Sequence, residues 1–191
     1  VLLSVPFLLM LAFSLINVIA NMGQLDLMLG TPVWPVTYLM LLAIRAGYSF
    51  LLIVIVTFYA GEAAWRERSL KLDGVLDAAP TPRFVPLLAK LLALWAACVV
   101  FMLAGVVALA GFQLAHGYTR LEPLVYAQGL LVETLPFLLA AVLAIALQVA
   151  LNHKLLGYLA MVLYLVSGVA LDALHFEHFL YRYGEVPRGP Y

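Results

Sequence analysis

The stretch HFEHF, residues 175–179, holds the side chains in this sequence that most resemble a metal site. It offers two imidazoles and a carboxylate, which are ligand types that zinc accepts. A zinc-peptidase helix needs two histidines four residues apart with a glutamate after the first, whereas His175 and His178 are only three apart. We therefore favour a short amphipathic surface segment over a metal site at this position.

Other patterns of catalysis are missing from the sequence. It contains no GxxxxGK[ST] phosphate loop, so this chain cannot itself be a P-loop ATPase, and none of its serines lies in a G-x-S-x-G turn. Cys98 is the single cysteine and lies in an apolar run, so it can form neither a disulfide framework nor a metal cage, and we expect a plain buried thiol. We predict no enzyme site, no metal and no cofactor in this chain.

Arg45 and Glu133 are charged residues inside long apolar runs. Arg45 lies eight residues after Thr37, where one run starts, and Glu133 lies eight residues after Val125, where another starts. Since a helical residue rises 1.5 Å, both charges should lie roughly 12 Å from the same end of their helices. A charge in lipid is costly without a partner, so the two side chains could form a pair. That pair could be a polar point in a substrate path or gate, or a structural bridge between two helices.

Smaller features of the apolar runs bear on packing. Asn17 and Gln148 are expected to form hydrogen bonds between helices rather than bind ligands. Pro136 can kink its helix by removing a backbone hydrogen bond. Gly105 and Gly111 would allow close helix approach, although they form no GxxxG motif.

The composition identifies the environment of these residues. Of the chain's residues, 66% are hydrophobic and 10% are charged, against roughly 45–50% and 25% in soluble domains. The formal net charge is zero, which gives no basic surface for nucleic acid. Five segments reach the length of about 20 apolar residues that a membrane-crossing helix needs, namely residues 2–20, 37–60, 87–115, 125–151 and 155–174. We predict an all-α integral membrane protein, a bundle of about five transmembrane helices forming one domain over residues 1–191.

The distribution of lysine and arginine predicts the orientation of the bundle. One side collects Arg66, Arg68, Lys71, Arg83, Lys90 and Lys154, and the other collects only Arg120, Arg182 and Arg188. The positive-inside rule places the first set in the cytoplasm. We therefore expect the Val1 end and the loop 61–86 to be cytoplasmic and the tail 175–191 to be extracytoplasmic.

The loop 61–86 is the most charged part of the chain. Seven of the 20 charged residues lie within residues 64–83. Apolar residues at helical spacing, among them Leu72, Val75 and Leu76, predict a short amphipathic cytoplasmic helix that ends at Pro80. Thr81 and Pro82 would then supply the N-cap and first-turn proline of the next helix. This helix could transmit motion from a soluble partner, or the charges could simply be an orientation signal in a long connection.

The stretch RERSLKLDGVLDAAPTPRFVPLLAKLLAL resembles the cytoplasmic loop of type-2 ABC exporter permeases. Arg66, Glu67 and Arg68 match the charged start of that loop, and Pro80, Arg83 and Lys90 match its turn and the lysine that opens the next span. Segments 58–68, 76–82, 117–123, 151–157 and 176–184 are similar to a bacterial subgroup that is often joined to a zinc-aminopeptidase-like domain. The glycine-threonine pair common in the general family's loop is absent.

The resemblance implies a transport component powered by another protein. In such permeases the loop helix docks on a cytoplasmic ATPase, which binds ATP and Mg, and the permeases work as dimers of six-span units in the bacterial inner membrane. The residues expected to contact the ATPase or pack the loop helix are Arg66, Glu67, Arg68, Lys71, Leu72, Val75, Leu76, Asp77, Pro80 and Arg83. We accordingly expect the chain to be part of a longer protein that pairs with a second permease unit.

Two other functions fit the same residues. The chain could be a membrane scaffold for an extracytoplasmic or fused peptidase-like domain, with its transport function lost. It could also be an intramembrane enzyme that uses Glu133, Asp172 or the histidines of the tail. Dependence on an ATPase separates the transporter from the scaffold. Loss of activity on changing Glu133 with ATPase binding intact would support a role of this residue in a substrate path or in catalysis.

Overall fold

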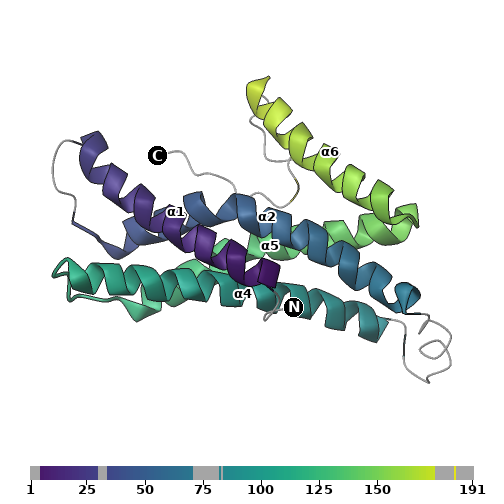
Figure 1. The fold of residues 1–191 in the computed structure, drawn as a ribbon, viewed down its shortest axis with the longest axis horizontal. Helices are drawn as coiled ribbons and strands as arrows, with labels where there is room; N and C mark the ends of the chain where they lie inside the picture. Colours follow the sequence, from purple (N-terminus) through teal and green to yellow (C-terminus); the bar gives the residue numbers. More distant parts are fainter. Residues whose placement is uncertain (1–4, 30–33, 71–81, 83, 175–182, 184–191) are drawn as a thin grey trace. The chain divides into compact units, whose positions relative to one another are not determined.

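The computed structural model describes residues 5–29, 34–70, 82, 84–174 and 183. Five helices make up nearly all of this part of the chain: α1 (Val5–Leu29), α2 (Thr37–Ser69), α4 (Phe84–Ala115), α5 (Pro123–Leu151) and α6 (Lys154–Ala173), as Figure 1 shows. These described residues contain no strand, which confirms the all-α prediction.

Three of the helices are long and apolar enough to cross a membrane. They are α2 over Thr37–Arg66, α4 over Phe84–Ala115 and α5 over Pro123–Leu151. Large apolar side chains such as Phe50 and Val107 are exposed on them, as expected for surfaces that meet lipid. The apolar stretches Phe7–Ala20 in α1 and Lys154–Gly168 in α6 are shorter. The membrane crossing of these two helices therefore stays a prediction. The protein is therefore a membrane protein with transmembrane helices.

The helix α2 is longer than the sequence pattern predicts. We expected its span to end at Ala60 and a loop to begin at Gly61, but the helix continues to Ser69. The physical reason is that residues 62–68 (EAAWRER) are mostly good helix formers and contain neither proline nor a second glycine. The helix thus continues nine residues past the predicted end of the span, into the segment predicted as the cytoplasmic loop.

The rest of the predicted amphipathic helix lies outside the described part of the chain. This applies to its residues from Lys71 to Pro80, and also to Thr81 and Arg83. Pro82 was expected in the first helical turn, but α4 begins at Phe84. The carbonyl oxygen of Pro82 accepts a hydrogen bond of 3.0 Å from the backbone amide of Val85.

Two short connections end helices by well-defined backbone geometry. Gly117 has a φ of 78°, and the amides of Gly117 and Tyr118 donate to the carbonyls of Leu114 and Gln113 at 3.1 and 2.9 Å. This is the Schellman arrangement, which satisfies the last carbonyls of α4. The connection between α5 and α6 is a tight turn, with Asn152 at a φ of 46°.

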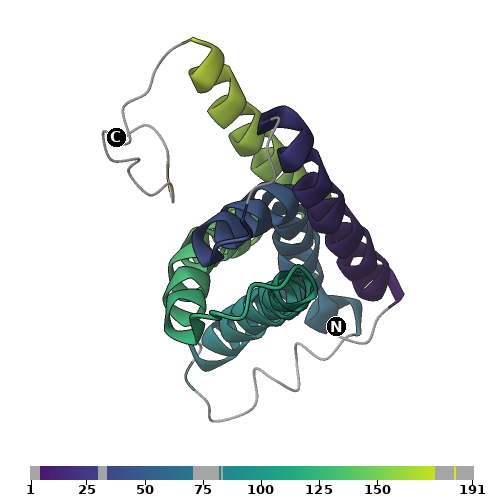
Figure 2. The same cartoon turned by 90° about the vertical axis from the view of Figure 1, so that its left-hand side faces the viewer.

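The chain divides into two compact units. The first comprises the described parts of residues 1–54 and 96–134, and so contains α1, the first half of α2, the second part of α4 and the start of α5. Figure 2 looks along these helices and shows α1 outside the group formed by α2, α4 and α5. The rings of Phe7 and Tyr48 both pack edge-on against Phe101, with centroid distances of 5.6 and 5.1 Å, so three helices share one aromatic cluster.

The glycines of α4 differ in their surroundings. A Cβ atom on Gly105 would lie 2.7 Å from the ring of Tyr48, so this glycine does permit a close approach of α4 to α2. A Cβ atom on Gly111 would meet nothing within 4 Å. The expectation of close packing was therefore right for Gly105 and wrong for Gly111, because the two residues face different directions on the helix.

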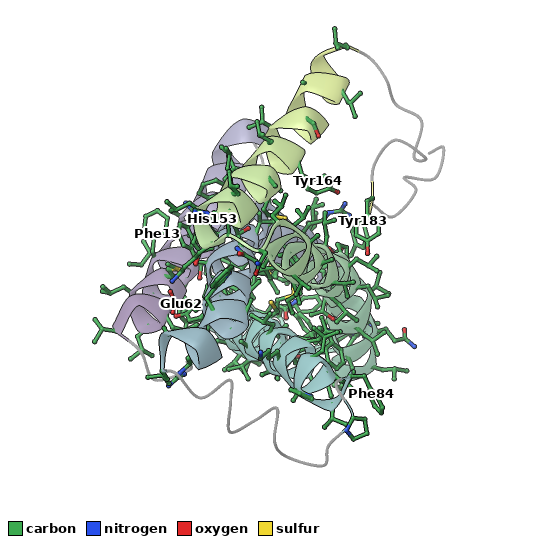
Figure 3. All side chains as sticks on the ribbon, turned by 90° about the vertical axis from the view of Figure 1, so that its right-hand side faces the viewer. Phe13, Glu62, Phe84, His153, Tyr164 and Tyr183 are labelled. Atoms are coloured by element: carbon green, nitrogen blue, oxygen red, sulfur yellow. The ribbon has the colours of Figure 1, made fainter. Side chains whose placement is uncertain are left out.

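The second unit comprises the described parts of residues 55–95 and 135–191. The rings of Phe58 and Tyr158 lie 5.5 Å apart and join α2 to α6, where Gly61 leaves room for the tyrosine ring. Tyr164 of α6 donates its hydroxyl to the backbone oxygen of Tyr183 at 2.5 Å, and Figure 3 shows these two residues side by side. Pro136 lies inside α5, which stays helical on both sides of it.

Candidate functional site

The structure brings together the two charges that the sequence places at equal depth. In the first unit, Nη1 of Arg45 on α2 lies 3.7 Å from Oε1 of Glu133 on α5. This distance is an ion pair but exceeds the 2.7–3.2 Å of a normal N–H···O hydrogen bond. The side chains are 47% and 23% exposed, so the pair lies at the surface of the helix pair and not in its core.

A groove with a volume of about 310 Å³ leads to this ion pair. The described residues that line it belong to α2 and α5, and Tyr38, Leu42 and Arg45 of α2 follow one another at intervals of four and three. That spacing puts them on one face of the helix. The lining residues of α5 are Val132 and Glu133 and, one and two turns earlier, Gln128, Gly129 and Val125. We call this feature the α2–α5 groove.

A glycine brings the two walls of the groove close together. A Cβ atom on Gly129 of α5 would lie 2.5 Å from Cδ1 of Leu41 on α2, a distance that any larger residue could not keep. Leu41 and Gly129 both line the groove. Its outer side stays open, because Tyr38, Leu42 and Val132 are 72%, 51% and 49% exposed.

A buried hydrogen-bond network joins α4 to α5 and to the segment before α2 in the same unit. The amide nitrogen of Gln113 on α4 donates to the carbonyl oxygen of Pro35 at 2.6 Å, and the hydroxyl of Tyr126 on α5 donates to the amide oxygen of Gln113 at 2.7 Å. Gln113 is completely buried. The sequence reasoning missed Gln113, although a lone amide in an apolar run is itself a sign of an interhelical hydrogen bond.

A second polar cluster lies in the second unit and is formed by Glu62, Trp65, Gln148 and Lys154. We call it the clasp. Nζ of Lys154 lies 2.6 Å from Oε1 of Glu62, and Nε1 of Trp65 donates to Oε1 of Gln148 at 2.8 Å. Both contacts join the end of α2 to the α5–α6 hairpin. The predicted interhelical hydrogen bond of Gln148 is confirmed.

The clasp is accessible to water on its ionic side. The side chains of Lys154 and Glu62 are 41% and 60% exposed, and in Figure 3 Glu62 and His153 lie at the same end of this unit. The hydrogen bond to Glu62 raises the pKa of Lys154 above its ordinary value. The sequence pattern identified Lys154 only as an orientation signal and assigned nothing to Glu62 or Trp65.

The residues predicted to contact an ATPase lie at or beyond the end of α2. Arg66 is exposed, and its backbone oxygen accepts hydrogen bonds from the hydroxyl of Ser69 at 2.8 Å and the amide of Leu70 at 3.0 Å. Glu67 and Arg68 belong to the same helix. The remaining members of that set, Lys71, Leu72, Val75, Leu76, Asp77, Pro80 and Arg83, lie outside the described residues.

Of the residues considered for metal or enzyme chemistry, Glu133 lies in the α2–α5 groove. His175 and His178 lie outside the described residues, and Asp172 is a member of α6. Among the described residues, no group of three or more histidine, cysteine, aspartate or glutamate side chains could hold a metal ion. Cys98 is a buried free thiol in α4, as predicted.

Comparisons of the chain with protein-family models, with curated proteins and with solved structures give no match. The likeness to type-2 ABC exporter permeases therefore rests on the residues of the charged loop and on the order of the segments around it.

Proposed function

We propose that this chain is the permease component of a type-2 ABC exporter, in which a separate cytoplasmic ATPase drives the movement of the transmembrane helices. The observation that carries the proposal is the length of α2. It has 33 residues, or about 50 Å at 1.5 Å per residue, whereas the hydrocarbon core of a bilayer is about 30 Å thick. One continuous helix thus joins a membrane span to the charged residues that resemble an ATPase-docking loop.

The clasp supports the same proposal. A docking segment can move the membrane helices only if it is mechanically tied to them. The contacts of Glu62 with Lys154 and of Trp65 with Gln148 tie the last turns of α2 to the α5–α6 hairpin. A displacement of the α2 end would therefore also displace this hairpin.

The expected partners follow from the resemblance to type-2 ABC exporter permeases. In the proposed complex Arg66, Arg68, Lys71 and Asp77 make polar contacts with the ATPase, and Leu72, Val75 and Leu76 pack the loop helix. ATP and Mg bind to the ATPase subunit. The complex lies in the bacterial inner membrane with the loop in the cytoplasm, and it contains a second permease unit.

Co-purification tests the proposal directly. The full-length protein is extracted from the membranes of its own host, and Mg-dependent ATPase activity is measured in the purified material. We expect the double variant Arg68→Glu, Lys71→Glu to reach the membrane in normal amounts but to lose the ATPase. Arg120→Glu is the matched control, because it reverses a charge on the predicted opposite side and should retain the ATPase. If neither the wild type nor the control carries an ATPase, the scaffold function replaces transport.

A further inference from the structure

The charged groups of the α2–α5 groove retain most of their capacity to bind a ligand. Within the described part of the chain, the guanidinium of Arg45 and the carboxylate of Glu133 have a single charged contact, with each other, at 3.7 Å. An arginine has five N–H donors and a carboxylate has about four acceptor positions. Groups this sparsely satisfied inside a membrane span are costly unless something else contacts them. Their arrangement places a positive and a negative site side by side.

The position of the groove determines which molecules can reach it. It extends from Tyr38, in the first turn of α2, to Arg45 and Glu133, roughly 10 Å further along the helices at 1.5 Å per residue. Its open side carries Leu42 and Val132, which are exposed apolar residues of two membrane-spanning helices. A ligand on this side has its apolar part in the bilayer.

We propose that the α2–α5 groove binds the headgroup of a zwitterionic phospholipid that carries a primary ammonium group, with the phosphate on Arg45 and the ammonium on Glu133. Arginine suits phosphate because its planar guanidinium donates two parallel hydrogen bonds. The ammonium donates to the carboxylate, and the amide of Gln128 and the hydroxyl of Tyr38 lie on the walls where they can serve the remaining headgroup atoms. The acyl chains leave through the open side, over Leu42 and Val132.

The charges and hydrogen-bonding groups of the site favour an ethanolamine headgroup over the other abundant headgroups. An anionic headgroup without an ammonium would place its phosphate near Glu133 with nothing to balance the carboxylate. A choline headgroup carries a positive charge but no N–H donor, so it cannot hydrogen-bond to Glu133. Selectivity for ethanolamine over glycerol and choline headgroups is therefore the signature of this site. The proposed lipid site requires that α2 and α5 cross the bilayer, and it does not depend on an ATPase.

Native mass spectrometry of the full-length protein, titrated with phosphatidylethanolamine, phosphatidylglycerol or phosphatidylcholine of identical acyl chains, measures this selectivity. We expect phosphatidylethanolamine to bind about tenfold more tightly than the other two, which corresponds to about 1.4 kcal/mol. Glu133→Gln should abolish the preference and favour phosphatidylglycerol, because Arg45 then remains alone. Arg45→Gln should weaken the binding of all three phospholipids.

A pair of variants that leaves both charges in place separates binding from folding. Val132→Phe fills the groove from its open side, whereas Leu131→Phe adds the same ring on an exposed position of α5 outside the groove lining. We expect Val132→Phe to weaken phosphatidylethanolamine binding about tenfold and Leu131→Phe to leave it unchanged. Equal binding of the three lipids to the wild type, or unchanged binding to Val132→Phe, would overturn the proposal. A change of oligomeric state in Val132→Phe with unaltered lipid binding would instead assign the groove to a second copy of the chain.

Discussion

The Gln113 network offers the sharpest test of how the first unit is held together. Gln113 is buried and joins three parts of the chain, with hydrogen bonds of 2.6 Å to Pro35 and 2.7 Å from Tyr126. Replacing it by leucine keeps most of the volume but leaves the carbonyl of Pro35 and the hydroxyl of Tyr126 without this partner.

The magnitude follows from the number of bonds lost. Side-chain hydrogen bonds within membrane proteins contribute about 0.6 kcal/mol on average and about 1.7 kcal/mol at most. Two such bonds predict that Gln113→Leu lowers the free energy of unfolding by about 1–3 kcal/mol. Tyr126→Phe removes only one bond and should cost about 0.6–1.7 kcal/mol.

A double-mutant cycle separates the network from general packing effects. The free energy of unfolding is measured in mixed micelles by titration with a denaturing detergent, for the wild type, each single variant and the pair. If the hydroxyl of Tyr126 acts through Gln113, Tyr126→Phe should cost almost nothing in the Gln113→Leu background. Equal costs in both backgrounds would refute the reasoning.

Two further predictions concern the clasp and the α4 glycines. Because the pKa of Lys154 is raised in the folded protein, the Glu62 contact stabilises the protein fully below the unfolded lysine pKa of about 10.4 and is lost as pH rises through the folded value. Thermal unfolding between pH 9 and 12 should show this loss in the wild type and not in Glu62→Gln. Gly105→Ala should destabilise by about 1–3 kcal/mol because its Cβ meets the ring of Tyr48, whereas Gly111→Ala, with open space around it, should be neutral or slightly stabilising in the same denaturation assay.

The length of each apolar run is the feature of the sequence that predicts the fold most directly. Backbone polar groups in lipid have no water to bind, so long apolar runs become helices whatever their neighbours are. For that reason the starts of α2 and α5 are close to the predictions. The helix α2 continues beyond the predicted span because the residues that follow Gly61 favour a helix.

Depth along a helix is also readable from the sequence, since counting residues from the start of each apolar run places Arg45 and Glu133 at the same level. Pairing needs more than equal depth, because it depends on which helices are neighbours and which faces they present. The 3.7 Å contact exists because α2 and α5 are adjacent, with Gly129 against Leu41. The clasp joins Glu62 to a lysine 92 residues away, and no local pattern marks such a pair.

The sequence by itself therefore determined that this is a helical membrane protein, where most of its helices lie and which charges enter the apolar runs. Those properties depend on local composition and on the physical chemistry of lipid. Only the tertiary structure decided that Gln113 is a buried junction, that Gly105 is packed and Gly111 is not, and that an open groove leads to the ion pair. These depend on the rotation of each helix about its axis, which is set by side chains far apart in the sequence.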